Sequence, residues 1–260
     1  PIAVDLDFRY QYDIDEKQYT REHVEDLIFA YLEELKKMFQ FDDSSKFHIY
    51  LFEKPSVNRI QEKQLTKDGI HMLIGIQMDR IGQQILRQRM ISKVRDMWRD
   101  LPITNKWEDV FDEGISKGSV NWQLYGSRKP NHDRYKLTYV YKITYDSSDD
   151  EFMRDEISLS KFDIESNIQQ LSIRNENHPQ LFLKSSFLKE REEFERKNNL
   201  KKAGNTNYKT TNIVRELPMM EDRTISNIKT RDELNMMLES FLESTLQSHL
   251  DYDLKDAYDY

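Results

Sequence analysis

The first ten residues, PIAVDLDFRY, predict a β-strand with two chemically different faces. Successive side chains of a strand point to opposite sides, so Asp5 and Asp7 would share one face. The opposite, apolar face would carry Ile2, Val4, Leu6 and Phe8. Two ionised carboxylates this close repel each other, and withdrawing them from water costs free energy, so a positive charge should lie nearby. A divalent cation would serve best; a solvated strand face, or pairing with Arg9 or Arg21, is the alternative.

The periodicities of the remaining chain predict a mixed α+β core over residues 1–145. Lys67-Asp68-Gly69 should form a turn, and residues 110–126 a hairpin around Lys117-Gly118. The polar run at 146–150 should end this core, and residues 204–229 read as a connector. Helices are expected over 20–39, 79–98, 184–203 and 231–250, and further strands over 47–52, 70–76 and 137–145.

Composition narrows the class of protein. The 260 residues include no cysteine, which excludes disulfides, cysteine zinc sites, iron–sulfur clusters and a thiol nucleophile. With no apolar run of about 18 residues and no signal peptide visible, we expect an intracellular protein without a membrane span. The net charge of −8 argues against a nucleic-acid coat, but an enzyme that holds metal ions with carboxylates can be acidic. Because the sequence starts at Pro1 without an initiator Met, we expect a fragment of a longer polypeptide.

Two further elements carry polar residues that suit a site. His71 lies on one face of the strand predicted at 70–76. A lone histidine is more often structural, but this one would be able to donate hydrogen bonds to a phosphate or a metal-bound group. In the predicted hairpin, Asp112, Asn121 and Gln123 would share a face, while Val120, Trp122 and Leu124 would fill the core side.

A basic turn follows the hairpin, at Gly126-Ser127-Arg128-Lys129-Pro130. Two cations, a hydroxyl and exposed backbone N–H groups suit a phosphate, although glycine, serine and proline also favour ordinary surface turns. Three acids, a histidine and a basic turn together indicate nucleotidyl transfer. In that chemistry, metal ions bridge the attacking hydroxyl and the α-phosphate, and cations hold the leaving pyrophosphate.

The motifs VDLDFRY, KDGIH and W-x-L-Y-G-S-x-K-P occur in this order, and with them the chain resembles the archaeo-eukaryotic primase superfamily. It is most similar to the primase portion of primase–helicases from large nucleocytoplasmic DNA viruses of the poxvirus, asfarvirus and mimivirus type. The resemblance covers about residues 1–175, including LSIRN at 171–175. It implies an RNA-recognition-motif-like mixed sheet packed against a second α/β layer, plus a helical C-terminal region. Residues 1–175 would be the catalytic domain, and 176–260 an accessory region and linker toward a helicase part.

The resemblance also implies DNA-templated primer synthesis and roles for particular residues. The metal ligands would be Asp5, Asp7 and Asp112, holding Mg²⁺ or Mn²⁺, with two ions expected. The nucleotide-binding residues would be His71, Lys129, Arg128, Ser127, Asn121, Gln123 and Gly69. Gly69 stands where many relatives have serine, so a backbone N–H would have to replace the hydroxyl.

The implied partners are a single-stranded DNA template, nucleoside triphosphates and a helicase domain on the same full-length chain, with no membrane. If the protein is viral, it would work at a cytoplasmic replication site of the host cell. No G-x-x-x-x-G-K-[ST] phosphate loop occurs in the sequence, so no ATP-driven motor is expected within it. A metal-dependent nuclease, another nucleotidyltransferase and a catalytically silent DNA-binding module remain the alternatives.

Overall fold

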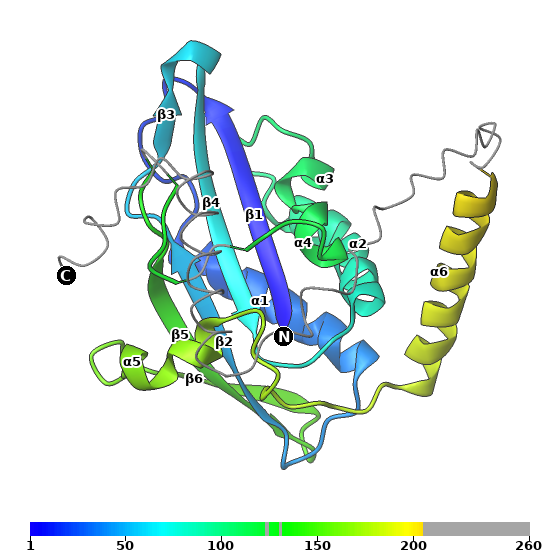
Figure 1. Ribbon diagram of the computed structural model, residues 1–260. Coiled ribbons are helices and arrows are strands. Elements are labelled where there is room, and N and C mark those ends of the chain that lie inside the picture. The colour runs from blue at the N-terminus through cyan, green and yellow to red at the C-terminus, as the bar shows by residue number, and fades with distance from the viewer. Residues whose placement is uncertain (123–124, 130–131, 205–260) are drawn as a thin grey trace, which may run out of the picture. The chain divides into compact units, whose positions relative to one another are not determined.

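An antiparallel sheet forms the centre of the computed structural model, which describes residues 1–122, 125–129 and 132–204 (Figure 1). These residues belong to one unit, Pro1–Thr206. The strand order is β1-β4-β2-β5-β6, and β3 pairs with β4. The strands are β1 (Ile2–Gln11), β2 (Lys46–Glu53), β3 (Asn58–Ile60), β4 (Leu65–Ile74), β5 (Lys136–Asp146) and β6 (Glu151–Glu156).

Helices cover one face of this sheet (Figure 1). The two long helices of this layer are α1 (Arg21–Met38) and α2 (Arg80–Met97). Shorter elements are α3 (Trp107–Val110), α4 (Glu113–Lys117), α5 (Ile164–Asn167) and the 3-10 turns Gln61–Lys63 and Ile168–Leu171. The last described helix is α6 (Ser185–Gly204). None of the helices in the described part of the chain is both long and apolar enough to span a bilayer.

The two faces of the sheet have different surroundings. The helix face holds the larger core, where Leu6, Leu27 and Met72 are completely buried. The apolar half of β1 therefore packs inward, as its alternation predicts. The other face carries a smaller cluster, made of Tyr50, Phe52, Leu73, Leu137, Val140 and Leu171. Asp5 and Asp7 lie on this second face, because they alternate with the buried residues of β1.

The α+β class and most long elements agree with the sequence predictions. The predicted strand at 2–8 and helices at 20–39 and 79–98 are confirmed as β1, α1 and α2, and the charged helix at 184–203 as α6. Every described strand pair is antiparallel, so the sheet is not mixed as expected. The packing against a second α/β layer and the domain boundary at residue 175 stay predictions, and residues 231–250 lie outside the described part.

The turn predicted at Lys67-Asp68-Gly69 is wrong. These residues lie inside β4, where each pairs with a residue of β1: Arg9, Phe8 and Asp7. Ten consecutive ladder pairs hold this segment extended, and such tertiary pairing outweighs a local turn preference. The short strands β3 and β6 are also additions that the periodicities did not indicate.

The hairpin predicted at residues 110–126 is wrong as well. Asp112 instead caps α4, and its Oδ1 accepts a hydrogen bond of 2.7 Å from the Gly114 N–H. Gly118, predicted as a hairpin turn residue, ends α4 at φ +63°, since glycine suits the left-handed end of a helix equally well. Val120 is exposed, so it does not fill a core.

Asp79 offers a test of how α2 begins. Its Oδ1 accepts a hydrogen bond of 2.8 Å from Gly82 N–H, and its Oδ2 pairs with Arg191 of α6. Asp79→Ala should lower the free energy of unfolding by about 1 kcal/mol, the usual cost of losing a helix N-cap. Asp79→Ser keeps a capping oxygen but loses the exposed ion pair, so it should stay within about 0.5 kcal/mol of the parent. Urea unfolding of both variants measures this, and equal losses would contradict the cap as the cause.

Candidate active site

The pairing of β1 with β4 brings the predicted acids and histidine onto one face. Asp5 lies directly opposite His71, and Asp7 directly opposite Gly69. Directly opposite residues of an antiparallel pair share a face, so all of these point away from the helices. The Nε2 of His71 is 3.4 Å from the Oδ1 of Asp5. The acid pair and the histidine thus form one cluster on adjacent strands.

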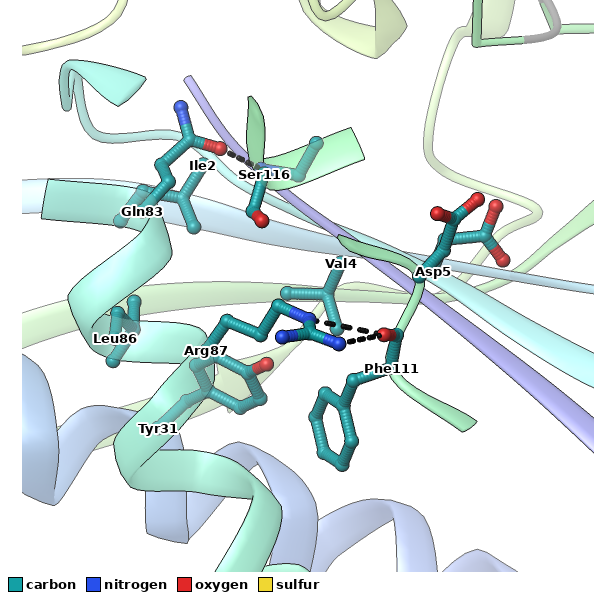
Figure 2. A pocket seen from close by; sticks show the side chains of 11 residues that line it. Ile2, Val4, Asp5, Tyr31, Gln83, Leu86, Arg87, Phe111 and Ser116 are labelled. Atoms are coloured by element: carbon teal, nitrogen blue, oxygen red, sulfur yellow. Dashed lines mark hydrogen bonds between the residues drawn. The ribbon is translucent and has the colours of Figure 1, made fainter. Parts of the chain in front are cut away.

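Asp112 reaches the same cluster from the segment between α3 and α4. Its N–H donates a hydrogen bond of 3.0 Å to the carbonyl oxygen of Asp5, and Phe111 bridges to Leu6. Arg87 of α2 anchors this segment, because its guanidinium donates to the Phe111 carbonyl oxygen at 2.8 and 3.0 Å (Figure 2). The third acid is therefore beside Asp5, as predicted, although a helix cap and not a hairpin places it there.

The charge of the acids is poorly compensated. Desolvation by the surrounding protein raises the pKa of Asp7, and the nearby charges of Asp5 and Asp112 raise it further, while Lys67 and His71 act in the opposite sense. Asp5 is mostly buried, with 15% of its side chain exposed, and its Oδ1 accepts no hydrogen bond from a described residue. Hard divalent cations prefer such carboxylate oxygens.

The acids do not form a complete cage. Within residues 1–122, 125–129 and 132–204, no group of three or more His, Asp or Glu side chains is arranged to hold a metal ion. Asp7 is exposed, so the cluster opens to solvent on that side. The donor chemistry fits a hard cation shared with a substrate, since Mg²⁺ is usually bound by one or two carboxylates together with substrate phosphates.

Aromatic rings pack against His71. The Tyr135 ring stacks on the imidazole, with centroids 3.6 Å apart and planes at 19°, and the Trp122 ring lies 4.5 Å away. Together with Phe52, Tyr125, Ser127 and Leu171, these residues line a hollow in front of the sheet. Sequence reasoning missed Tyr135, and it assigned Trp122 to the core.

Lysines gather beside the acids. Lys54 follows β2, and its Nζ lies 4.9 Å from the centroid of the Tyr135 ring. Burial lowers the pKa of Lys54, while the charge of Asp7 raises it and that of Lys129 lowers it. Burial also lowers the pKa of His132, and the charges of Lys54, Lys129 and Lys67 lower it further. Lys54 and Lys67 therefore lie within electrostatic reach of Asp7, and Lys129 lies within reach of Lys54.

Only one of these lysines was predicted from sequence, namely Lys129. Lys67 was missed because residues 67–69 were predicted as a turn. Only the register with β1 places Lys67 on the face of the acids. Lys54 stands two residues after Phe52, which pairs with His71, so strand alternation would have placed it there once the register was known. Of the other predicted residues, Arg128 and Asn121 are exposed, Ser127 lines the hollow, and Gln123 lies outside the described residues.

Comparison with known proteins shows which family the chain belongs to. A family model described as "C962R protein N-terminal AEP domain" matches residues 1–141, a span that includes every acid and lysine of the cluster. The chain belongs to this archaeo-eukaryotic primase (AEP) family. A protein of Acanthamoeba polyphaga mimivirus named "Putative helicase L207/L206" is 30% identical over 148 residues. That match covers 56% of this chain and 14% of the mimivirus protein, so the chain spans a small part of that relative's length.

Proposed function

We propose that this AEP domain makes primers on a DNA template by nucleotidyl transfer from nucleoside triphosphates. The observation that carries the proposal is the placement of Asp5, Asp7 and His71 on one sheet face, with Asp112 hydrogen-bonded to Asp5. Lysines beside these acids would bind the triphosphate, because it needs positive charge at the phosphates that do not contact metal.

In this proposal the carboxylates of Asp5, Asp7 and Asp112 hold Mg²⁺ or Mn²⁺, with two ions expected. Bound there, the ions would supply Lewis-acid stabilisation of charge on the reacting phosphate and on the attacking hydroxyl. His71 donates a hydrogen bond to the triphosphate, and Lys54, Lys67 and Lys129 neutralise its phosphates. Arg87 acts indirectly, by fixing the segment that carries Asp112.

The proposed partners follow from the reaction. Nucleoside triphosphates and single-stranded DNA are the substrate and template. A helicase domain is the further partner, supported by the mimivirus relative that is named as a helicase and is much longer than the matched part. If the chain is viral, we place this activity at the cytoplasmic replication site of the infected cell.

Two other functions fit part of the site. A metal-dependent nuclease would use the same acids, and a DNA-binding module without catalysis would use only the lysines. The lysines near the acids and the opening at Asp7 favour a substrate with several phosphates over simple hydrolysis of one phosphodiester bond.

The direct test uses the full 260-residue chain with single-stranded DNA, labelled nucleoside triphosphates and Mg²⁺ or Mn²⁺. We expect dinucleotides and longer primers on a denaturing gel, with ribo- and deoxynucleotides tried separately. Shortened DNA without new product would instead support the nuclease. No synthesis and no extension of a primed template would contradict the proposal. DNA affinity that persists after Asn replaces all three acids, in a protein that makes no product, would support the silent module.

A further inference from the structure

Tyr135 occupies a position in the candidate site that its place in the sequence does not reveal. It lies immediately before β5, whereas Asp5, Asp7 and His71 belong to β1 and β4. Its ring nevertheless stacks on the His71 imidazole at 3.6 Å and 19°. Such close, nearly parallel contact restricts how the imidazole can turn, because its rotation would push the phenol ring away.

The hydroxyl of Tyr135 fills the space above Gly69. A Cβ placed on Gly69 would lie 3.1 Å from the Tyr135 Oη and 2.5 Å from the carbonyl oxygen of Leu6. Any larger residue at 69 would therefore displace the phenol or the β1 backbone. Because Gly69 has no side chain, the Tyr135 phenol oxygen can occupy the space next to its Cα.

The backbone of Gly69 is already engaged. Its N–H donates a hydrogen bond of 2.8 Å to the Oδ1 of Asp68, whose side chain is completely buried. That N–H is thus not free to donate to a ligand. The Tyr135 hydroxyl is the polar hydrogen that the structure brings there instead.

The surroundings of this hydroxyl indicate what it can bind. Burial raises the pKa of Tyr135, and the charges of Asp5, Asp7 and Asp68 raise it further, so the phenol stays un-ionised and keeps its proton. The ammonium group of Lys54 lies on the ring itself. A ligand that binds beside Lys54 and this hydroxyl would carry negative charge and accept hydrogen bonds, as phosphate oxygens do.

We propose that the Tyr135 hydroxyl donates a hydrogen bond to the triphosphate of the incoming nucleotide, while its ring holds His71 in position. This inference rests on the proposed function, because it assigns a residue to the same triphosphate site. The ring and the hydroxyl have separable roles, so they can be tested with different substitutions.

Tyr135→Phe removes the hydroxyl and keeps the stacked ring. Since a hydrogen bond to a charged acceptor is worth about 1.5–3 kcal/mol, the dissociation constant for ATP should rise about 10-fold or more. Affinity for AMP should fall less, and affinity for adenosine should not change. Isothermal titration calorimetry with Ca²⁺ present measures all three ligands. His71→Ala, assayed in parallel, reports whether the histidine contributes to the same triphosphate site.

The matched control is Tyr139→Phe. Tyr139 packs with the helix-side core, away from the site. Tyr139→Phe removes the same phenol oxygen as Tyr135→Phe, and this variant should bind ATP as the parent does. Unchanged ATP affinity in Tyr135→Phe would overturn the inference, while primer synthesis by the parent would leave the proposed function standing. An equal loss of affinity for ATP, AMP and adenosine would also overturn it, because the hydroxyl would then not be bound to phosphate. A parent chain that neither binds ATP nor makes primers would reject the proposed function together with this inference.

Discussion

Replacing Asp5 or Asp7 by Asn is expected to reduce primer synthesis about 10³-fold or more. Metal-bound charge stabilisation supplies several kcal/mol to such a transition state, and each 1.4 kcal/mol corresponds to a factor of about ten in rate. Asn keeps the shape of the side chain but removes the charge that would hold the cation. Product formation on single-stranded DNA, at saturating nucleoside triphosphate, measures the loss.

The same variants should fold normally, and their stability gives a readout that does not depend on activity. The folded-state pKa of Asp7 lies above its ordinary value of 3.8, so folding favours the protonated form. The free energy of unfolding should therefore fall as the pH rises above about 4 and through the folded-state pKa. Asp7→Asn removes this dependence and should have a melting temperature at pH 7 equal to or slightly above that of the parent.

Divalent cations sharpen this test. Mg²⁺ or Mn²⁺ that binds only the folded protein should raise the melting temperature of the parent, and should raise that of Asp5→Asn and Asp7→Asn much less. The control is Asp26→Asn, an exposed acid on α1 on the far face of the sheet, which should leave both activity and the cation effect unchanged. Full primer synthesis by either site variant would contradict the assignment of these acids.

Leu6→Ala is expected to cause a large loss of stability. Leu6 stands between the two acids but points into the helix-side core, where it has no exposed surface. Deleting such a buried side chain costs about 3–5 kcal/mol, from lost burial and from the cavity left behind. For a unit of this size that corresponds to a fall in melting temperature of about 6–20 °C.

Leu159→Ala is the matched control, because Leu159 is 40% exposed and its loss should cost less than about 1 kcal/mol. Thermal and urea unfolding of both variants measures the difference. Similar losses for the two leucines would show that β1 is not the buried strand described here. Leu6→Ala should lose stability, whereas Asp5→Asn should lose activity and fold normally. This difference is expected for a strand with one face in the core and the other face in the candidate site.

Sequence patterns predicted those residues of the candidate site that lie in an alternating strand or in a motif. The acid pair and His71 belong to strands with clear alternation, and both were placed correctly. The structure brings Asp112 next to Asp5 through a helix cap and not through the predicted hairpin, since the same glycine signal fits a hairpin turn and a helix end. The hydrogen bond that brings Asp112 to Asp5 joins residues more than a hundred positions apart, and local patterns carry no information about it.

By itself, the sequence determined the two faces of β1 and the helices α1 and α2. These follow from side-chain periodicity, which depends only on neighbours along the chain. The tertiary structure decided the straight course of Lys67 to Gly69, the position of Lys54, and the placement of Tyr135 over Gly69 and His71. All of these depend on the register between strands distant in sequence, which is set by the packing of the whole sheet.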